Sequence, residues 1–418
     1  MLCSRRTERA LAIGPVKGEF QLQAAVAFSN EPNSFTAAAR AAREALTDLG
    51  GVAPELALIF HTAEHDAEQV RTGARHALGD GTRLAGGHAV GTITSDHFGY
   101  GGHELALGLF AGVDPAIHAR APLAGDEEAV GRALGADLQA AGLSRAPLLL
   151  LYDAINRTPT GMQLNMATPL LRGLEASAGA LGQVVGAGLT GDMRGSATWQ
   201  IIDDDVSQQN AIALSFGRDL QLDEVILHGC EPASDYKTVT RADGPVILEL
   251  DHRPAVDVIS ELVGHAVPPT AFGFFVTLGV NLGDPWAPYD SGVYLNRLCL
   301  KVDRRRGGII LFESDIVEGT RVQLMHRRVD FEDIQPRIDR VFAALEGRRP
   351  VFALYIDCAG RAAGYAGVDR EDALLVQQAV AGRVPLLGWY SGVEIASVLG
   401  RPRPLDWTGV FCLFSEAA

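Results

Sequence analysis

Residues Leu56-Ala57-Leu58-Ile59-Phe60 form a short apolar run bounded by proline and polar residues, which is typical of a buried strand. A helical pattern follows and ends at a glycine. A small-residue segment at 86–94 and an apolar strand at 105–110 then complete the unit. The run Leu148–Tyr152 opens the same order of elements again. The sequence therefore predicts an internal repeat.

The second copy carries its own signals for the start and end of a helix. Thr160-Gly161-Met162-Gln163 has the form of a capping box, which predicts a helix start. Because proline lacks a backbone N–H, Pro169 is expected to kink this helix or to begin a new one after Thr168. Gly179 ends the helix, and the remaining strands of the copy are predicted at 184–193 and 211–216.

A third copy is predicted at the end of the chain. Val351–Asp357 has the composition of a strand, and Asp369 is placed to cap the helix that follows. Later strands are predicted at 384–388 and 409–414. Amphipathic helices accompany the three copies, each followed closely by glycine, at 37–49, 130–141 and 338–345.

The segment between the second and third copies has a different pattern. Strand-like runs at 246–250, 271–279, 293–302 and 309–313 are joined by turns, and the turn at 303–308 carries a basic triplet. This triplet would bind phosphate or form a solvated hairpin tip, and the acidic chain favours the hairpin tip. We place a domain boundary near 229–235, with one domain at 1–228 and another at 229–418. The predicted class is α/β, with repeated strand-helix-strand-strand units, mixed sheets and two domains.

Composition excludes several classes of function. The 418-residue chain has a net charge of −15, which repels phosphate backbones and anionic lipids, so we expect no nucleic-acid or membrane partner. No apolar run approaches the ~20 residues of a membrane span, and no signal peptide is predicted. The five cysteines are far apart, which indicates reduced thiols in the cytoplasm.

The motifs for common cofactors lack their required context. Gly186-Ala187-Gly188-Leu189-Thr190-Gly191 matches a dinucleotide fingerprint, but a strand-like run at 198–202 follows where the fingerprint needs a helix. His61 and His65 have the spacing of zinc ligands on a helix, but no further ligand stands at motif spacing. We therefore predict no cofactor and no metal.

Polar side chains follow several predicted strands, and in α/β sheets ligands bind at such strand ends. Cys358 and Arg361 follow one strand of the third copy, Tyr390, Ser391 and Glu394 follow another, and Asn156 and Arg157 follow a strand of the second. These seven residues are the predicted ligand-binding residues. Arg361 would hold a carboxylate and Glu394 an ammonium group. The alternative is a structural Arg361–Glu394 ion pair beside a buried Cys358.

These motifs resemble those of the FIST family, which pairs a FIST-N with a FIST-C domain. Cys358-Ala359-Gly360-Arg361 is similar to its C-x-G-R, and Gly388-Trp389-Tyr390-Ser391-Gly392-Val393-Glu394-Ile395 to its G-x-x-S-Y-G-E-I. The repeated glycine turn and His228-Gly229-Cys230-Glu231-Pro232 fit the FIST-N pattern. Val393 adds a branched side chain where the family has glycine, so the local turn or the ligand is expected to differ here.

The resemblance implies an intracellular sensory module that binds a small ligand such as an amino acid, often fused to an output domain. Because the chain ends soon after its last predicted strand, we expect a stand-alone receptor or a sensor that needs a signalling protein partner. Two alternatives stay open. One is an enzyme with Cys358 as its nucleophile, and the other is a repeat scaffold that binds a protein partner.

Overall fold

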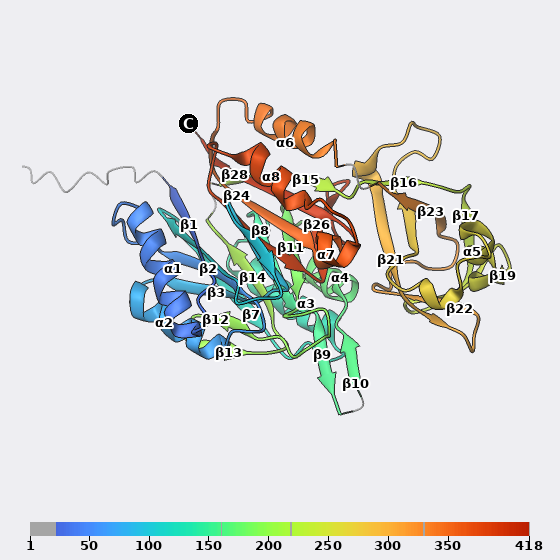
Figure 1. Cartoon of the computed structure of the whole chain (residues 1–418), viewed down its shortest axis with the longest axis horizontal. Coiled ribbons are helices and arrows are strands. Elements are labelled where there is room, and N and C mark those ends of the chain that lie inside the picture. The colour runs from blue at the N-terminus through green and yellow to red at the C-terminus, as the bar shows by residue number, and fades with distance from the viewer. Residues whose placement is uncertain (1–21, 160, 218–219, 329–330, 418) are drawn as a thin grey trace, which may run out of the picture.

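The computed structural model describes residues 22–159, 161–217, 220–328 and 331–417, which form two regions (Figure 1). One region is a large body built from the repeated units. The other, coloured yellow to orange, lies beside it and spans the strands labelled β16 to β23. The class is α/β with mixed sheets and two domains, as the sequence predicted.

Each repeated unit contains a parallel pair of strands joined by a helix. The second strand of each pair lies on one side of the first, and an antiparallel strand lies on the other side. The three units are β2 (Leu56–His61), α2 (Ala67–Leu78), β3 (Arg83–His88) and β6 (Leu105–Ala111); β8 (Leu148–Asp153), α4 (Ala167–Ala178), β11 (Val184–Leu189) and β14 (Ala211–Ser215); and β24 (Arg349–Cys358), α8 (Asp372–Val380), β25 (Leu386–Ser391) and β28 (Gly409–Glu416).

Every unit completes the sheet of another unit. A hairpin of the first unit pairs with β25 of the third, one of the third pairs with β11 of the second, and one of the second pairs with β3 of the first. The exchange is a closed cycle, so no unit forms its six-stranded sheet alone. The hairpins are β4 (Gly91–Thr94) with β5 (Phe98–Tyr100), β26 (Val393–Val398) with β27 (Arg401–Leu405), and β12 (Gln200–Ile202) with β13 (Asp205–Ser207).

A glycine stands at the same register position in all three units, and in the third unit it is Gly388. Gly86 pairs with Ile59, and Gly186 pairs with Leu150, at φ angles of 139° and 158°. A Cβ atom at either glycine would lie 1.9 or 1.8 Å from the carbonyl oxygen of its partner. Only glycine allows this close approach of backbones.

Further strands and helices cover the outer edges and faces of the three sheets. The outer strands pair with β6, β14 and β28, and they are β1 (Gln23–Ser29), β7 (Ala116–Arg120) and β15 (Gln221–Leu227). The outer helices pack on α2, α4 and α8, and they are α1 (Ser34–Asp48), α3 (Glu127–Ala140) and α6 (Ile334–Ala343). One apolar core joins the three sheets, and within it Trp389 stacks on Phe60 at 4.0 Å between ring centroids.

The second region is a closed sheet. Its strand β20 pairs with both β21 and β23, so the strands from β23 to β20 form a ring, which we call the barrel. Its elements are β16 (Cys230–Pro232), β17 (Lys237–Asp243), β18 (Val246–Leu250), β19 (Arg253–Pro254), α5 (Ala255–Val263), η1 (Pro269–Ala271), β20 (Thr277–Asn281), η2 (Ser291–Val293), β21 (Tyr294–Asp303), β22 (Gly308–Leu311) and β23 (Arg321–Arg327). The predicted hairpin tip at 303–308 joins β21 to β22.

Three local predictions need correction. Thr160 lies outside the described residues, and the rest of the predicted capping box forms β10 (Gly161–Leu164), which pairs with β9 (Ile155–Thr158). The helix of that unit begins at Ala167, so Pro169 lies in its first turn, where its missing N–H costs nothing.

Helix α8 begins at Asp372 after Glu371, so Asp369 does not cap it. The strand predicted at 271–279 begins at Thr277, because η1 and a turn precede it.

Candidate ligand-binding site

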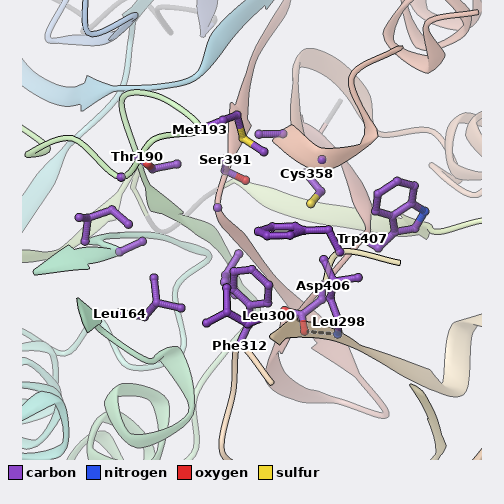
Figure 2. Close-up of a pocket in the computed structure, with 18 of the residues that line it drawn as sticks. Leu164, Thr190, Met193, Leu298, Leu300, Phe312, Cys358, Ser391, Asp406 and Trp407 are labelled. Carbon is purple, nitrogen blue, oxygen red and sulfur yellow. Dashed lines mark hydrogen bonds between the residues drawn. The ribbon is translucent and has the colours of Figure 1, made fainter. Parts of the chain in front are cut away.

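A cavity of about 110 Å³ lies between the repeat body and the barrel (Figure 2). The carboxyl ends of β11, β24 and β25 reach it from the body, together with the β9–β10 hairpin. Residues of β21 and its neighbours reach it from the barrel. A buried water needs about 10–15 Å³ of such space, so the cavity has room for several waters or one small organic molecule.

Most of the cavity wall is apolar. The hairpin supplies Met162 and Leu164, and the barrel supplies Leu298, Leu300 and two phenylalanines. The rings of Phe274 and Phe312 lie 5.6 Å apart. Since the Phe274 side chain is 48% exposed, it marks the side on which the cavity meets solvent. Apolar walls with a few polar groups are typical of small-molecule sites.

Asp406 is a buried carboxylate in the cavity lining with one oxygen atom that has no hydrogen-bond partner. It is buried, and its Oδ2 atom accepts a hydrogen bond from the Leu298 backbone N–H at 2.8 Å (Figure 2). Its Oδ1 atom is also buried but has no hydrogen-bond partner. Burial raises the pKa of Asp406 to about 6. The cavity therefore contains a hydrogen-bond acceptor that the protein itself leaves unused.

Cys358 and Ser391 line the cavity from the ends of the parallel pair β24–β25, where they are register partners. The Ser391 hydroxyl donates to Glu394 Oε1 at 2.9 Å, and Glu394 Oε2 is buried without a partner. Burial raises the pKa of Glu394 well above its usual range. Burial and the neighbouring Glu394 do the same for the Cys358 thiol. A thiol in this state is a poor nucleophile.

Arg361 lies outside the cavity lining and is held by carboxylates. Its Nε donates to Asp357 Oδ1 at 3.1 Å, its Nη2 donates to Asp372, and its Nη1 donates to the His228 carbonyl oxygen at 3.1 Å. Burial alone would lower its pKa, but Asp372 and Asp357 outweigh burial, and the pKa is raised. Arg361 therefore does not form the structural ion pair with Glu394 that was the alternative from the sequence. It pairs with Asp357 and Asp372 instead.

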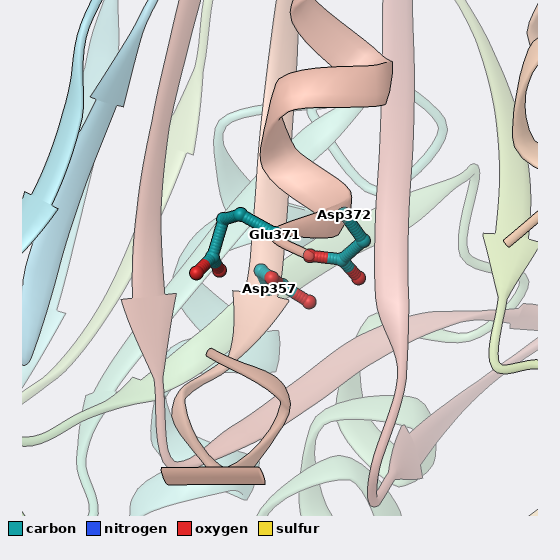
Figure 3. Close-up of side chains that lie close together, drawn as sticks. All are labelled: Asp357, Glu371 and Asp372. Carbon is teal, nitrogen blue, oxygen red and sulfur yellow. The ribbon is translucent and has the colours of Figure 1, made fainter. Parts of the chain in front are cut away.

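The carboxylates around Arg361 form a close group of three acids: Asp357, Glu371 and Asp372 (Figure 3). Such a group has the spacing to hold a cation. Here the guanidinium of Arg361 supplies the positive charge, because it contacts Asp357 and Asp372. Glu371 accepts from the Tyr390 hydroxyl at 2.8 Å and from the Ala363 backbone N–H at 2.9 Å. Each of the three acids thus has an internal partner, while Asp357 Oδ2 and Asp372 Oδ1 are buried without one.

The other predicted site residues lie at different distances from the cavity. Tyr390 points to Glu371, and its pKa is raised well above the usual range by burial. Asn156 is half-buried and Arg157 is exposed on β9, although Ile155 of the same strand lines the cavity. Of the seven predicted residues, Cys358 and Ser391 are the two in the cavity lining, and Glu394 contacts Ser391.

Sequence reasoning did not select Asp406 or the barrel wall. Asp406 follows the hairpin strand β27, which the sequence did not distinguish from a loop. The barrel residues Leu298, Leu300 and Phe312 belong to apolar runs that predict strands but carry no sign of a ligand site. Their contribution depends on how the barrel packs against the body.

The architecture is that of an α/β protein with a body of three repeated units, a barrel, and a cavity between the body and the barrel. Comparison with known families assigns it further: the FIST N domain matches residues 55–253 and the FIST C domain matches residues 255–397. The chain belongs to the FIST family. FIST domains are associated with sensory and signal-transduction roles. The boundary predicted at residues 228 and 229 stays a prediction.

The relatives found in sequence comparisons cover from 39% to 94% of the chain. An uncharacterized protein of Mycobacterium tuberculosis (strain H37Rv) is 27% identical over 408 residues, which cover 94% of this chain and 99% of the relative. A protein of Methanocaldococcus jannaschii is 24% identical over 168 residues, covering 39% and 32% of the two chains. The crystal structure of a cyanuric acid hydrolase from A. caulinodans covers 95% of this chain and 100% of its own, with a TM-score of 0.29 and 12% identity. This likeness is too low to carry an argument.

In the part of the chain that the structure describes, no helix combines the length and the apolar character needed to cross a membrane.

Proposed function

We propose that the protein is a non-catalytic sensor that binds a small molecule in the cavity between the repeat body and the barrel. The observation that carries the proposal is Asp406, a buried carboxylate with an unused oxygen atom in an apolar cavity. Leaving a buried acceptor unpaired costs about 1–3 kcal/mol. A bound molecule with a hydrogen-bond donor would remove that cost.

Amino acids and similar small polar molecules are one class of ligand with such a donor. An ammonium group would be accepted by Asp406 at the cavity wall, with Glu394 close behind Ser391. Because the cavity walls come from both the repeat body and the barrel, a bound ligand would favour the arrangement in which the body and the barrel close around it. A signalling partner would then respond to that arrangement.

Cytoplasmic location is part of the proposal. Cys230, Cys299, Cys358 and Cys412 are buried free thiols, which supports a reducing compartment. The raised pKa of Cys358, in a cavity lining without an imidazole among its described residues, gives no support to a cysteine-dependent enzyme.

Native mass spectrometry of the full chain as purified, combined with calorimetric titration of indole, tests the proposal. Indole is a small neutral molecule with an apolar ring and one N–H donor. We expect a retained small molecule or saturable binding of one indole per chain. We also expect Leu300→Trp, which fills the cavity, to abolish the binding.

The matched control is Leu374→Trp, which adds the same bulk at a residue on α8 that is 39% exposed. This variant should bind indole as the unaltered chain does. The proposal is wrong if no small molecule is retained and indole does not bind, or if Leu300→Trp binds indole as tightly as the control while both variants remain folded.

A further inference from the structure

The cavity wall contains acidic residues but no basic ones among the described residues, and this difference bears on which ligands the cavity binds. Asp406 places a buried carboxylate in the cavity wall. Asp192 lines the cavity as well, and its carboxylate accepts hydrogen bonds from Ser196 and from the Arg194 backbone N–H. None of the described residues that line the cavity is a lysine, an arginine or a histidine. An anionic group of a ligand would therefore meet carboxylates and apolar side chains.

Three arginines in this part of the fold have other hydrogen-bond partners, and the charge of one of them, Arg297, also favours the ionised form of Asp406. Arg361 is held by Asp357 and Asp372. Arg297, which is fully buried, donates through its Nε to Asp315 Oδ1 at 2.7 Å.

Arg327 is occupied as well. It lies over the Trp407 ring, with 3.7 Å from its Cζ to the ring centroid, and it donates to the Thr277 hydroxyl and the Phe274 carbonyl oxygen. None of these three guanidinium groups belongs to the cavity lining. To bind a carboxylate through one of these three arginines, the site would have to break the contacts that hold it, at a cost of several kcal/mol.

Asp406, in contrast to these arginines, has an oxygen atom without a partner. Asp406 Oδ1 is buried and free, while Asp406 Oδ2 is fixed by the Leu298 backbone N–H, so the carboxylate is already oriented. Phe274 and Phe312 line the same cavity, as does Trp407, one face of which Arg327 already covers. Aromatic faces attract cations, and the attraction strengthens where water is excluded.

We infer that the cavity selects a small aromatic amine, with its ammonium group on Asp406 and its ring among the apolar walls, and that it rejects a ligand carrying a free carboxylate. The inference rests on the proposed ligand-binding function and narrows it. An amino acid with its carboxylate masked, as an ester or amide, satisfies the site. The free amino acid binds more weakly because its carboxylate must be desolvated without a cationic partner.

Calorimetric titration of the full chain with four related probes tests the inference. Phenethylamine carries the ammonium alone, 2-phenylethanol a neutral donor, 3-phenylpropionate a carboxylate alone, and phenylalanine both charges. We expect phenethylamine to bind at least tenfold more tightly than 2-phenylethanol and phenylalanine. We expect 3-phenylpropionate to show no saturable binding.

The variant Asp406→Asn locates the recognition. Asparagine keeps an oxygen for the Leu298 N–H but loses the charge, so phenethylamine should bind at least tenfold more weakly while 2-phenylethanol changes by less than about threefold. Asp257→Asn removes an exposed carboxylate of the barrel and should leave the binding of both probes unchanged. The order of the four probes on the unaltered chain is informative even if Asp406→Asn does not fold.

The outcomes separate this inference from the proposed function. If indole binds and Leu300→Trp removes its binding, but phenylalanine or 3-phenylpropionate binds as tightly as phenethylamine, the cavity is a ligand site of another class and the inference is wrong. The inference is also wrong if Asp406→Asn binds phenethylamine unchanged. If no probe binds, indole included, the proposed function fails as well.

Discussion

The carboxyl ends of β2–β3 and of β24–β25 are equivalent edges of the repeated unit, but they bury opposite chemistry. At the first edge, His61 and His88 are buried with their Nε2 atoms unpartnered, and their rings lie 4.9 Å apart. At the second edge, Arg361 is buried among carboxylates, with Asp357 at the strand end and Asp372 at the start of α8. Both edges bury polar atoms without partners, but one edge buries imidazoles and the other buries a guanidinium with the carboxylates that pair with it.

The contrast between the two edges shows that the strand pairing of a unit and the polar side chains at the carboxyl ends of its strands depend on different contacts. The scaffold depends on close backbone pairing, as at Gly86, Gly186 and Gly388, where an added Cβ would meet the carbonyl oxygen of the paired residue in each of the three units. The edge chemistry depends on side chains beyond the paired positions. A unit can therefore exchange imidazoles for a guanidinium and carboxylates without changing its strand order.

Arg361→Met should cause the largest loss of stability at these edges. The variant leaves two buried carboxylates without their cation, and breaking a buried pair typically costs about 3–5 kcal/mol. Urea unfolding at pH 7.5 measures the loss of stability. A variant that does not fold at all would also agree with the prediction. Arg401→Met, which breaks an exposed pair with Glu175, is the control and should lose far less. If Arg361→Met unfolds at the same urea concentration as that control, Arg361 does not hold this edge together.

Gly86→Ala and Gly186→Ala should cost less, about 1–3 kcal/mol each, because an added Cβ forces two paired strands apart. The losses in the two units should agree closely, since both Cβ atoms meet a carbonyl oxygen at the same register position. Gly81→Ala is the control, because open space surrounds its Cβ position. Clearly unequal losses, measured by urea unfolding, would show that the two units are not equivalent at this position.

The repeat was predictable because it is local. Runs such as 56–60 and 148–152 predict buried strands from five consecutive side chains, and those strands form as expected. The exchange of hairpins between units was not predictable, since nothing local in Val393–Val398 specifies pairing with β11. The site was predictable in part for the same reason. Cys358 and Ser391 end their own strands, whereas Asp406 belongs to the cavity only once a hairpin of the third unit and a strand of the barrel meet.

His61→Leu should have the smallest effect at neutral pH and a larger one in acid. At pH 7.5 the variant loses the bond from His61 Nδ1 to the Thr62 carbonyl oxygen, which still accepts from the His65 backbone N–H at 3.1 Å. The loss should be under about 1.5 kcal/mol. Burial and the neighbouring His88 lower the pKa of His61 well below its usual value, and burial lowers that of His88 to about 4.

The sign of the acid effect follows from these pKa values. A histidine whose pKa is lower in the folded chain than in the unfolded chain contributes stability above pH 6.5, and that contribution is lost as the pH falls towards the folded pKa. The unaltered chain therefore loses stability between pH 6.5 and 5 partly through His61, and His61→Leu should lose less over the same interval. Urea unfolding at pH 7.5, 6 and 5 measures the difference, with His76→Leu as a control that removes an exposed imidazole from the same unit. Equal acid sensitivity in His61→Leu and the unaltered chain would mean that the imidazole edge takes up protons as readily when folded as when unfolded, and the contrast with the Arg361 edge would then disappear.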